Sequence, residues 1–318
     1  MEQVQRIKFI IEKKPTVVLI GNETKILRKC VEHLISKELA TKQNLIVLEG
    51  PEEKIQNFKF YLQKTQFGVL ILKEEVKKFN EFLKFLRELP PKNNLVFNFE
   101  EKKLRKLKDL VNLHSLSFGM DEKADVFVSS LKLNLGMNLK ISFGGAIVPF
   151  WIEGVFGKEY TLSLLATIAF GILLGMNLVE ISRNFSDFEG VPGKKRLIKG
   201  ISGSLIIDDS NSFEEKEQKE ALEILKEIPW AKRKICVLDT HSQEEIFELA
   251  SKIADFVFVF GKKEFLKREL DKKILFFDKI KEGVENMKKI LRENDVVLIL
   301  GSQKINFGQI IDNIRKIW

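Results

Sequence analysis

The chain has 318 residues and a formal net charge of +8, because 53 Lys and Arg residues outnumber 45 Asp and Glu residues. A hydrophobic share of 44% beside a charged share of 31% fits a soluble globular protein, and the length fits two domains with separate cores. The lysines are spread along helices that also carry glutamates, and Phe (26) far outnumbers Tyr (2), so we expect no nucleic-acid partner.

Cysteine and histidine usage predicts reduced thiols and no metal cluster. Cys30 and Cys236 are far apart in the sequence, which is typical of buried thiols in a cytosolic protein. The three histidines are also widely separated and lack metal-ligand spacing: His33, His114 and His241. Because the N-terminus is charged from its second residue and has no apolar signal-peptide region, we expect a cytoplasmic location.

The first predicted element is the apolar strand 16–21, which is followed by a helix that runs to about Leu39. Between them, Gly21 and the residues up to Lys25 form a turn. A strand, a glycine turn and a helix N-terminus are the frame of a phosphate-binding loop, in which backbone amides face an anion. From these residues alone, an ordinary strand-to-helix turn is the alternative.

Strands and helices alternate through the rest of the first half. Further strands are predicted at 44–48, 67–72, 95–99 and 115–119, with a helix between the first two and another at 76–89. From Ala124 to Phe156 the pattern is β-rich, with turns at Gly136 and at Gly144-Gly145. We expect antiparallel strands there, beside a parallel sheet.

The segment Tyr160–Val179 carries no charged residue over 20 positions, which is long enough to span a bilayer. Gly171, Gly175 and Asn177 are nevertheless typical of helix packing and of a helix stop, and strand-helix alternation resumes directly afterwards. We therefore predict a buried helix and no membrane span.

The second half predicts a doubly wound sheet, because continuous apolar strands alternate with amphipathic helices. The predicted strands are 205–207, 234–238, 256–260, 274–277 and 295–300. The predicted helices are 214–228, 243–253, 263–269, 279–292 and 305–316. Helices at 161–176 and 178–186 close the preceding domain, so we expect one domain at 1–188 and a second at 189–318.

The segment Val191–Ser212 reads VPGKKRLIKGISGSLIIDDSNS. A Pro-Gly turn leads into a basic strand at 194–201, and a turn at Gly203 leads into an apolar strand that ends in Asp208 and Asp209. Carboxylates at the end of a buried strand lie at the rim of a sheet, where open α/β sheets hold ligands. They suit ribose hydroxyls or a hydrated metal ion. The alternative is a plain strand end that caps the following helix.

This order of a Pro-Gly turn, a basic strand, a glycine turn, the I-D-D-S strand end and a helix resembles the Mur ligases. These are the ATP-dependent amide ligases of peptidoglycan precursor synthesis, and the branch that adds D-alanyl-D-alanine is the most similar. The resemblance is continuous from Asp208 to Leu222 and extends back through Gly157–Gly190 and forward to Ser302. It implies a P-loop-type central domain with a mixed sheet, followed by a doubly wound, Rossmann-like C-terminal domain. We expect no counterpart of the family's N-terminal UDP-sugar domain, so a protein partner that supplies it is implied.

The resemblance implies ATP and Mg²⁺ as cofactors and identifies no catalytic residue. It assigns nucleotide binding to seven residues: Gly21, Lys25, Lys194, Arg196, Asp208, Asp209 and Ser302. It assigns metal binding to Glu49, directly after the predicted strand 44–48. A solvated glutamate beside the turn residues Gly50 and Pro51 is the alternative for Glu49.

Several positions depart from the family's pattern. Thr24 replaces the second glycine of the phosphate loop, and Ile26 replaces a hydroxyl residue that would hold Mg²⁺. Phe82 stands where the family has a carbamylated lysine, and Ser163 stands where it has an asparagine beside the adenine. The turn at 301–303 lacks the two cations of the family's K-G-S-R. Its amides are still able to bind an anion, and a plain strand-to-helix turn is the alternative.

Each of these losses would remove stabilisation of the transferring phosphoryl group. The sequence therefore favours a Mur-ligase-like protein that has lost much of its ATP machinery and acts as a non-catalytic partner or regulator. The alternative is a divergent but active ATP-dependent ligase that joins an acid to an amino acid in cell-wall precursor synthesis. A simple nucleotide-binding module is a third interpretation, by analogy of fold alone.

Overall fold

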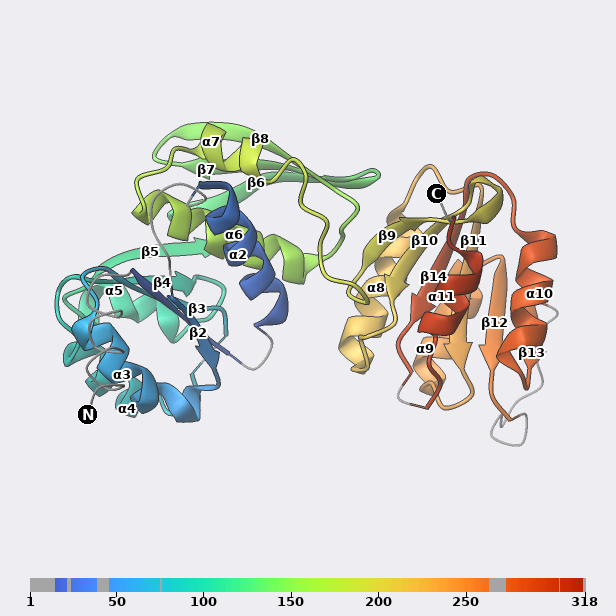
Figure 1. Cartoon of the computed structure of the whole chain (residues 1–318), viewed down its shortest axis with the longest axis horizontal. Helices are drawn as coiled ribbons and strands as arrows, with labels where there is room; N and C mark the ends of the chain where they lie inside the picture. The colour runs from blue at the N-terminus through green and yellow to red at the C-terminus, as the bar shows by residue number, and fades with distance from the viewer. Residues whose placement is uncertain are drawn as a thin grey trace, which may run out of the picture. The chain divides into compact units, whose positions relative to one another are not determined.

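A computed structural model describes residues 15–21, 24–38, 46–74, 76–262, 273–302 and 304–316. The described chain forms two compact units, each built on one sheet (Figure 1). Unit 1 takes the described residues up to Lys132, with Asn138–Ile152 and Lys158–Phe188. Unit 2 takes Leu133–Met137, Glu153–Gly157 and the described residues from Glu189 onward.

Among the described residues, the sheet of unit 1 has eight strands in the order β2-β1-β3-β4-β5-β6-β7-β8. Their bounds are β1 (Thr16–Ile20), β2 (Ile46–Gly50), β3 (Gly68–Leu72), β4 (Asn93–Asn98), β5 (His114–Gly119), β6 (Val126–Leu133), β7 (Gly136–Phe143) and β8 (Ala146–Glu153). β1 to β5 are parallel, and β1 and β3 are buried at every residue, as apolar runs are in a parallel sheet with both faces covered. Two-residue turns join β6 to β7 and β7 to β8, so these strands form the predicted antiparallel part and extend the same sheet.

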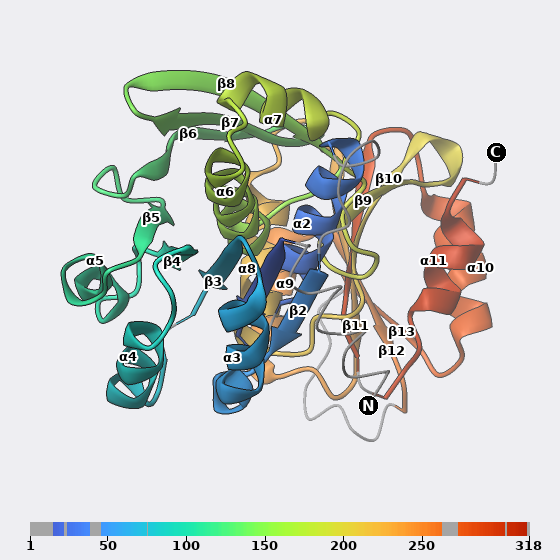
Figure 2. The ribbon, with the colours of Figure 1, turned by 60° about the vertical axis from the view of Figure 1, so that its left-hand side comes forward.

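The helices of unit 1 are α2 (Lys25–Glu38), α3 (Ile55–Lys64), α4 (Phe79–Arg87), α5 (Leu107–Leu110), α6 (Lys158–Leu173) and α7 (Leu178–Asn184), with 3-10 turns η2 (Glu52–Lys54) and η3 (Leu104–Lys106). The α3, α4 and α5 helices bury their apolar residues in one core cluster with strand residues such as Leu70 and Leu95. The α6 helix packs against α2 and against β3, β4 and β5 (Figure 2).

The helix predicted at 76–89 is shorter than expected. It is α4, and it begins only at Phe79. The Glu52 carboxylate accepts hydrogen bonds of 2.6 Å from the backbone amides of Lys77 and Lys78. These side-chain bonds hold the chain in a turn before the helix starts.

The apolar segment after Tyr160 is the buried helix α6, as predicted. Leu165, Ile168 and Phe170 are fully buried. A Cβ on Gly171 would lie 2.9 Å from Cδ1 of Ile181, so this glycine allows α6 and α7 to pack closely. Within the described residues, no helix combines the length and apolar character needed to cross a membrane.

Among the described residues, the sheet of unit 2 has six strands in the order β13-β12-β11-β14-β10-β9. Their bounds are β9 (Arg196–Lys199), β10 (Leu205–Asp209), β11 (Arg233–Asp239), β12 (Phe256–Phe260), β13 (Ile274–Phe277) and β14 (Asp295–Leu300). The helical elements are η4 (Ile201–Gly203), α8 (Glu215–Glu227), α9 (Glu244–Ile253), α10 (Ile280–Ile290) and α11 (Gly308–Ile314). All strand pairs are parallel except β9 with β10, so the predicted doubly wound fold is confirmed.

Two elements of unit 2 are shorter than predicted. The basic strand expected from residue 194 begins at Arg196, because Lys195 has a left-handed backbone (φ 47°) and ends a turn. The helix expected from residue 305 begins at Gly308, because the Ser302 hydroxyl accepts bonds from the Lys304 and Ile305 amides and holds a turn. The helix predicted at 263–269 lies outside the described residues.

Candidate functional site

The topology of unit 2 places the carboxyl ends of three strands side by side. β14 lies between β10 and β11. The helices that follow β10 and β11, α8 and α9, pack on one face of the sheet, whereas α11, which follows β14, packs on the other face. Such a reversal opens a crevice beyond the strand ends, where doubly wound folds bind ligands. Asp208 lies near the end of β10, Asp239 ends β11, and Ser302 follows β14.

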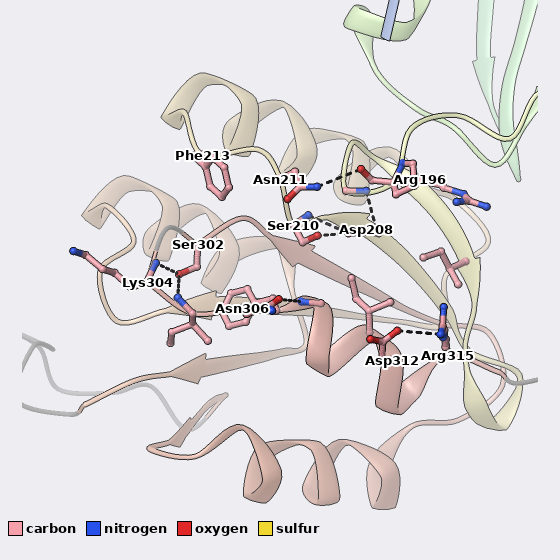
Figure 3. A pocket seen from close by; sticks show the side chains of 17 residues that line it. Arg196, Asp208, Ser210, Asn211, Phe213, Ser302, Lys304, Asn306, Asp312 and Arg315 are labelled. Carbon is pink, nitrogen blue, oxygen red and sulfur yellow. Dashed lines mark hydrogen bonds and ion pairs between the residues drawn. The ribbon is translucent and has the colours of Figure 1, made fainter. Parts of the chain in front are cut away.

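A pocket of about 730 Å³ opens beside these strand ends (Figure 3). Its charged and aromatic lining residues are Arg196, Asp208, Phe213, Lys304, Phe307, Asp312 and Arg315. A smaller pocket of about 200 Å³, over the end of β11, shares Phe213, Ser302 and Lys304 with it. Of the five residues predicted to bind nucleotide in this unit, Arg196, Asp208 and Ser302 therefore line the larger pocket, and Lys194 and Asp209 do not.

Asp208 organises the rim of the larger pocket. Its Oδ2 accepts a hydrogen bond of 2.8 Å from the Gly193 amide, and its Oδ1 accepts bonds from the Ser210 amide (3.1 Å) and hydroxyl (2.6 Å). The Asn211 amide donates to the Gly193 carbonyl, so the Pro-Gly turn and the end of β10 are joined twice. Both carboxylate oxygens are thus used to hold the loop.

Asp209 points to the interior instead. It is fully buried, and its Oδ1 accepts a bond of 2.5 Å from the Ser212 hydroxyl, whereas Oδ2 has no hydrogen-bond partner among the described residues. Burial raises the pKa of Asp209 to about 7, against the opposing attraction of the Lys195 ammonium 3.9 Å away. Lys195 also lies 3.4 Å from the Glu220 carboxylate, so this is a buried cluster of charges.

The two predicted cations of the basic strand differ in role. Lys194 is buried, and its ammonium donates to Glu217 over 2.8 Å. Arg196 is half-buried, and its guanidinium lies 3.5 Å from the exposed carboxylate of Glu189. Only Arg196 therefore offers its charge to the pocket.

Ser302 holds the turn that follows β14. Its hydroxyl donates to Oδ2 of Asp239 and accepts bonds from the amides of Lys304 (3.1 Å) and Ile305 (2.9 Å). A Cβ on Gly301 would lie 2.2 Å from the carbonyl oxygen of Ser212, so only glycine fits there. Because the amides of Lys304 and Ile305 are engaged, the described part of this turn has the geometry of a plain strand-to-helix turn.

In unit 1, Glu49 is bound by the chain's own side chains. Its Oε2 accepts a bond of 3.2 Å from the Thr24 hydroxyl, and its Oε1 lies 2.7 Å from the Arg28 guanidinium. Lys25 is the exposed first residue of α2, and Gly21 follows β1 directly. A Cβ on Gly21 would lie 3.6 Å from the carboxyl carbon of Glu74, so a negative charge already faces this glycine.

Phe82, which stands where the family has a carbamylated lysine, contacts other protein side chains, and so does Lys73. Phe82 is buried in the core cluster and stacks on Phe85, with ring centroids 6.3 Å apart. Lys73, directly after β3, is buried and pairs with Glu159 of α6 over 3.3 Å. In the described ranges, no three His, Cys, Asp or Glu side chains are grouped as metal ligands. Among the described residues, Glu49 is engaged by Arg28 and Thr24 and Phe82 offers no ligand atom, so these positions do not fit a Mg²⁺ ion.

Sequence reasoning missed Arg28, Phe213, Lys304 and Arg315. Arg28 reaches Glu49 only because β2 lies beside β1 in the sheet. Arg315 reaches the pocket because it pairs across to Gly200, beyond the end of β9. No local pattern indicates either contact. In the sequence, only the apolar residue Phe213, directly after the polar D-D-S-N-S run, could have indicated a residue of this pocket. Its ring is exposed in the structure.

Comparison with known proteins places these features in a family. Residues 196–303 match the model for the Mur ligase glutamate ligase domain. The UDP-N-acetylmuramate--L-alanine ligase of Alkaliphilus metalliredigens is 24% identical over 163 residues, which are 51% of this chain and 35% of that protein. The ligase of the same name from Clostridium acetobutylicum is 23% identical over 257 residues, which are 77% of this chain and 53% of that protein. The chain thus spans about a third to a half of the length of these relatives.

Solved structures share the fold. MurF ligase from Thermotoga maritima, in complex with ADP, has a TM-score of 0.72 at 16% identity, covering 98% of this chain and 83% of that one. The UDP-N-acetylmuramoylalanyl-D-glutamyl-2,6-diaminopimelate--D-alanyl-D-alanyl ligase from Acinetobacter baumannii has a TM-score of 0.75 at 14% identity, covering 97% and 77%. The two sequence relatives named above are L-alanine ligases, whereas the Acinetobacter baumannii structure is a D-alanyl-D-alanyl ligase. The similarity to the branch of the family that adds D-alanyl-D-alanine therefore stays a prediction. The resemblance to the Mur ligases is confirmed: residues 196–303 match their glutamate ligase domain, and the chain has the fold of Mur ligase structures.

Proposed function

We propose that this protein is a Mur-ligase-like protein of peptidoglycan precursor synthesis whose ATP and Mg²⁺ site is degraded, and that it acts in the cytoplasm as a non-catalytic partner or regulator. One observation carries the proposal. The carboxylate of Glu49, the residue assigned to the metal, is held by the Arg28 guanidinium at 2.7 Å and by the Thr24 hydroxyl.

The neighbouring contacts support the same conclusion. Mg²⁺ needs several oxygen ligands in near-octahedral order. Here the one assigned carboxylate is engaged by Arg28, in a partly exposed pair that a metal ion would have to displace. The Glu74 carboxyl group lies beside Gly21, at the start of the loop. Phe82 packs in the core, where the family has a charged, metal-bridging side chain.

The alternative is a divergent, active ATP-dependent ligase. It is favoured by Lys25, which keeps an exposed ammonium group at the start of α2, and by the shared fold with a MurF ligase whose structure contains ADP. Such a ligase would have to break the Arg28–Glu49 pair before it bound a metal ion.

A calorimetric titration of the full chain with ATP and Mg²⁺ tests the proposal. We expect no saturable binding tighter than about 1 mM, which corresponds to roughly 4 kcal/mol. Lys25→Ala should then match the wild type, and so should Lys29→Ala, which removes another exposed lysine of α2. Micromolar, Mg²⁺-dependent binding that Lys25→Ala abolishes and Lys29→Ala retains would contradict the degraded site and favour the active ligase instead.

A further inference from the structure

Three cations on the larger pocket of unit 2 have no part in the degraded nucleotide site of unit 1. Arg196 comes from β9, Lys304 from the turn after β14, and Arg315 from the end of α11. Among the described residues, the Arg196 and Arg315 guanidinium groups form ion pairs with exposed carboxylates, Glu189 at 3.5 Å and Asp312 at 3.1 Å. Within the described residues, the Lys304 ammonium makes no ion pair. Exposed pairs of this kind are weak, so all three charges are available to a ligand.

These cations do not converge on one point. In Figure 3, Lys304 lies at the opposite end of the pocket from Arg196 and Arg315. A single compact anion would contact one end only. The arrangement matches an elongated ligand that carries negative groups at both ends.

The lining of the pocket is partly apolar. Ile198, Ile305 and Ile311 line it, and the ring of Phe213, which is 46% exposed, lies on the side of Ser302 and Lys304 in Figure 3. An exposed aromatic ring in a pocket is a favourable contact for an apolar side chain. The ligand should therefore also carry an apolar side chain.

The acidic residues of the pocket do not oppose an anionic ligand strongly. Both oxygens of Asp208 accept hydrogen bonds from Gly193 and Ser210, and Asp312 is paired with Arg315. The lining holds three cations, Arg196, Lys304 and Arg315, against these two carboxylates, so the pocket keeps a positive balance.

We propose that this pocket binds an extended acidic segment of a partner protein, with acidic residues at both ends and an apolar side chain between them. The proposal rests on the role proposed above, in which this protein acts with another protein, and it specifies which kind of segment of that other protein is bound. Arg196 and Arg315 bind one acidic end, Lys304 binds the other, and Phe213 contacts the apolar side chain.

Fluorescence anisotropy with the full chain and a fluorescein-labelled peptide, EEALAEE, tests this. We expect saturable binding that weakens with salt and is lost for the neutral peptide QQALAQQ. Lys304→Ala and Arg315→Ala should each weaken binding about 2- to 5-fold, and their effects should multiply because they act at opposite ends. Lys281→Ala, which removes an exposed lysine of α10 outside the pocket, is the matched control and should change nothing.

Three results would overturn the proposal: equal binding of QQALAQQ, an equal loss with Lys281→Ala, or no saturable binding of EEALAEE. Binding of inorganic phosphate that depends on Lys304 or Arg315, without peptide binding, would make this a small-anion pocket instead. None of these results bears on the ATP titration with Lys25→Ala, because Lys25 belongs to unit 1.

Discussion

The ammonium group of Lys73 and the carboxylate of Glu159 form an ion pair inside unit 1, with Nζ 3.3 Å from Oε1. Lys73 follows β3 and Glu159 lies in the first turn of α6, 86 positions along the chain. The pair joins a helix to the edge of a parallel sheet where a ligand lies in many α/β proteins. At this edge of the sheet, the charge of Lys73 is therefore balanced by Glu159 of the protein itself.

Removing one partner of this pair should destabilise the protein. Glu159→Gln removes the carboxylate charge 3.3 Å from the buried ammonium of Lys73, so the free energy of unfolding should fall by about 3 kcal/mol. Glu88→Gln, in the surface pair of Glu88 with Lys59, is the control and should change stability little. Urea denaturation measures both. If the double variant Lys73→Met/Glu159→Leu fails to recover most of the loss, the pair is not the cause.

Phe82 should behave as a core residue. Phe82→Ala removes a ring that is 2% exposed and should lower the free energy of unfolding by about 3–5 kcal/mol. Phe60→Ala, on the 38%-exposed ring of α3, should cost less than about 1 kcal/mol. Phe82→Lys should be the most damaging, because it buries an unpaired charge, and it should not create ATP binding. A stable Phe82→Lys protein that binds Mg²⁺–ATP would refute this account of the site.

Gly301 should be essential for the turn beside the pocket. In Gly301→Ala the new Cβ would approach the Ser212 carbonyl oxygen to 2.2 Å, so the backbone must shift at a cost of about 1–3 kcal/mol. The shift should also weaken binding of EEALAEE, because Ser302 and Lys304 follow directly. Gly145→Ala, where the added Cβ meets open space, should show only the backbone cost of its left-handed conformation, about 1–2 kcal/mol. Thermal unfolding with the anisotropy assay checks both expectations, and unchanged peptide binding in Gly301→Ala would contradict the link.

Asp209 should give the protein a specific pH dependence. Burial raises its pKa in the folded state to about 7, from a value near 3.8. The folded protein therefore holds a proton that the unfolded chain releases above about pH 4. The stabilisation of the folded state by this proton is complete below about pH 4. It falls by at most about 1.4 kcal/mol per pH unit as the pH rises, and it is gone above about pH 7.

The comparison with Asp209→Asn isolates this effect. The stability of the wild type relative to the variant should decrease between about pH 4 and pH 7 and then level off. Urea denaturation at several pH values in this range measures it. A difference that stays constant with pH would mean that Asp209 is already ionised in the folded protein at low pH.

Most of the fold could be predicted from local pattern. The strands at 256–260, 274–277 and 295–300 have the predicted bounds, because continuous apolar runs bounded by turn residues leave little choice of register. The start of α4 was misplaced because the Glu52 carboxylate, distant in sequence, binds the Lys77 and Lys78 amides. Helix boundaries depend on such partners, which propensity does not reveal.

The candidate site was predictable only in part. The D-D run was expected at the rim of the sheet, but successive residues of a strand point to opposite faces. Asp208 therefore lines the pocket, whereas Asp209 is buried beside Lys195. Lys194 and Arg196 were both assigned to nucleotide binding, yet the left-handed backbone at Lys195 separates their environments.

By itself, the sequence determined the alternation of strands and helices, the doubly wound second half and the likeness to the Mur ligases, because these depend on local periodicity and on residue order. Only the tertiary structure decided which charges meet. Arg28 and Glu49 are 21 positions apart, and the acidic and basic groups of the unit 2 pocket come from separate strands, turns and helices. Coulomb interactions act across space rather than along the chain, so the fold had to bring these side chains together before their partners were defined.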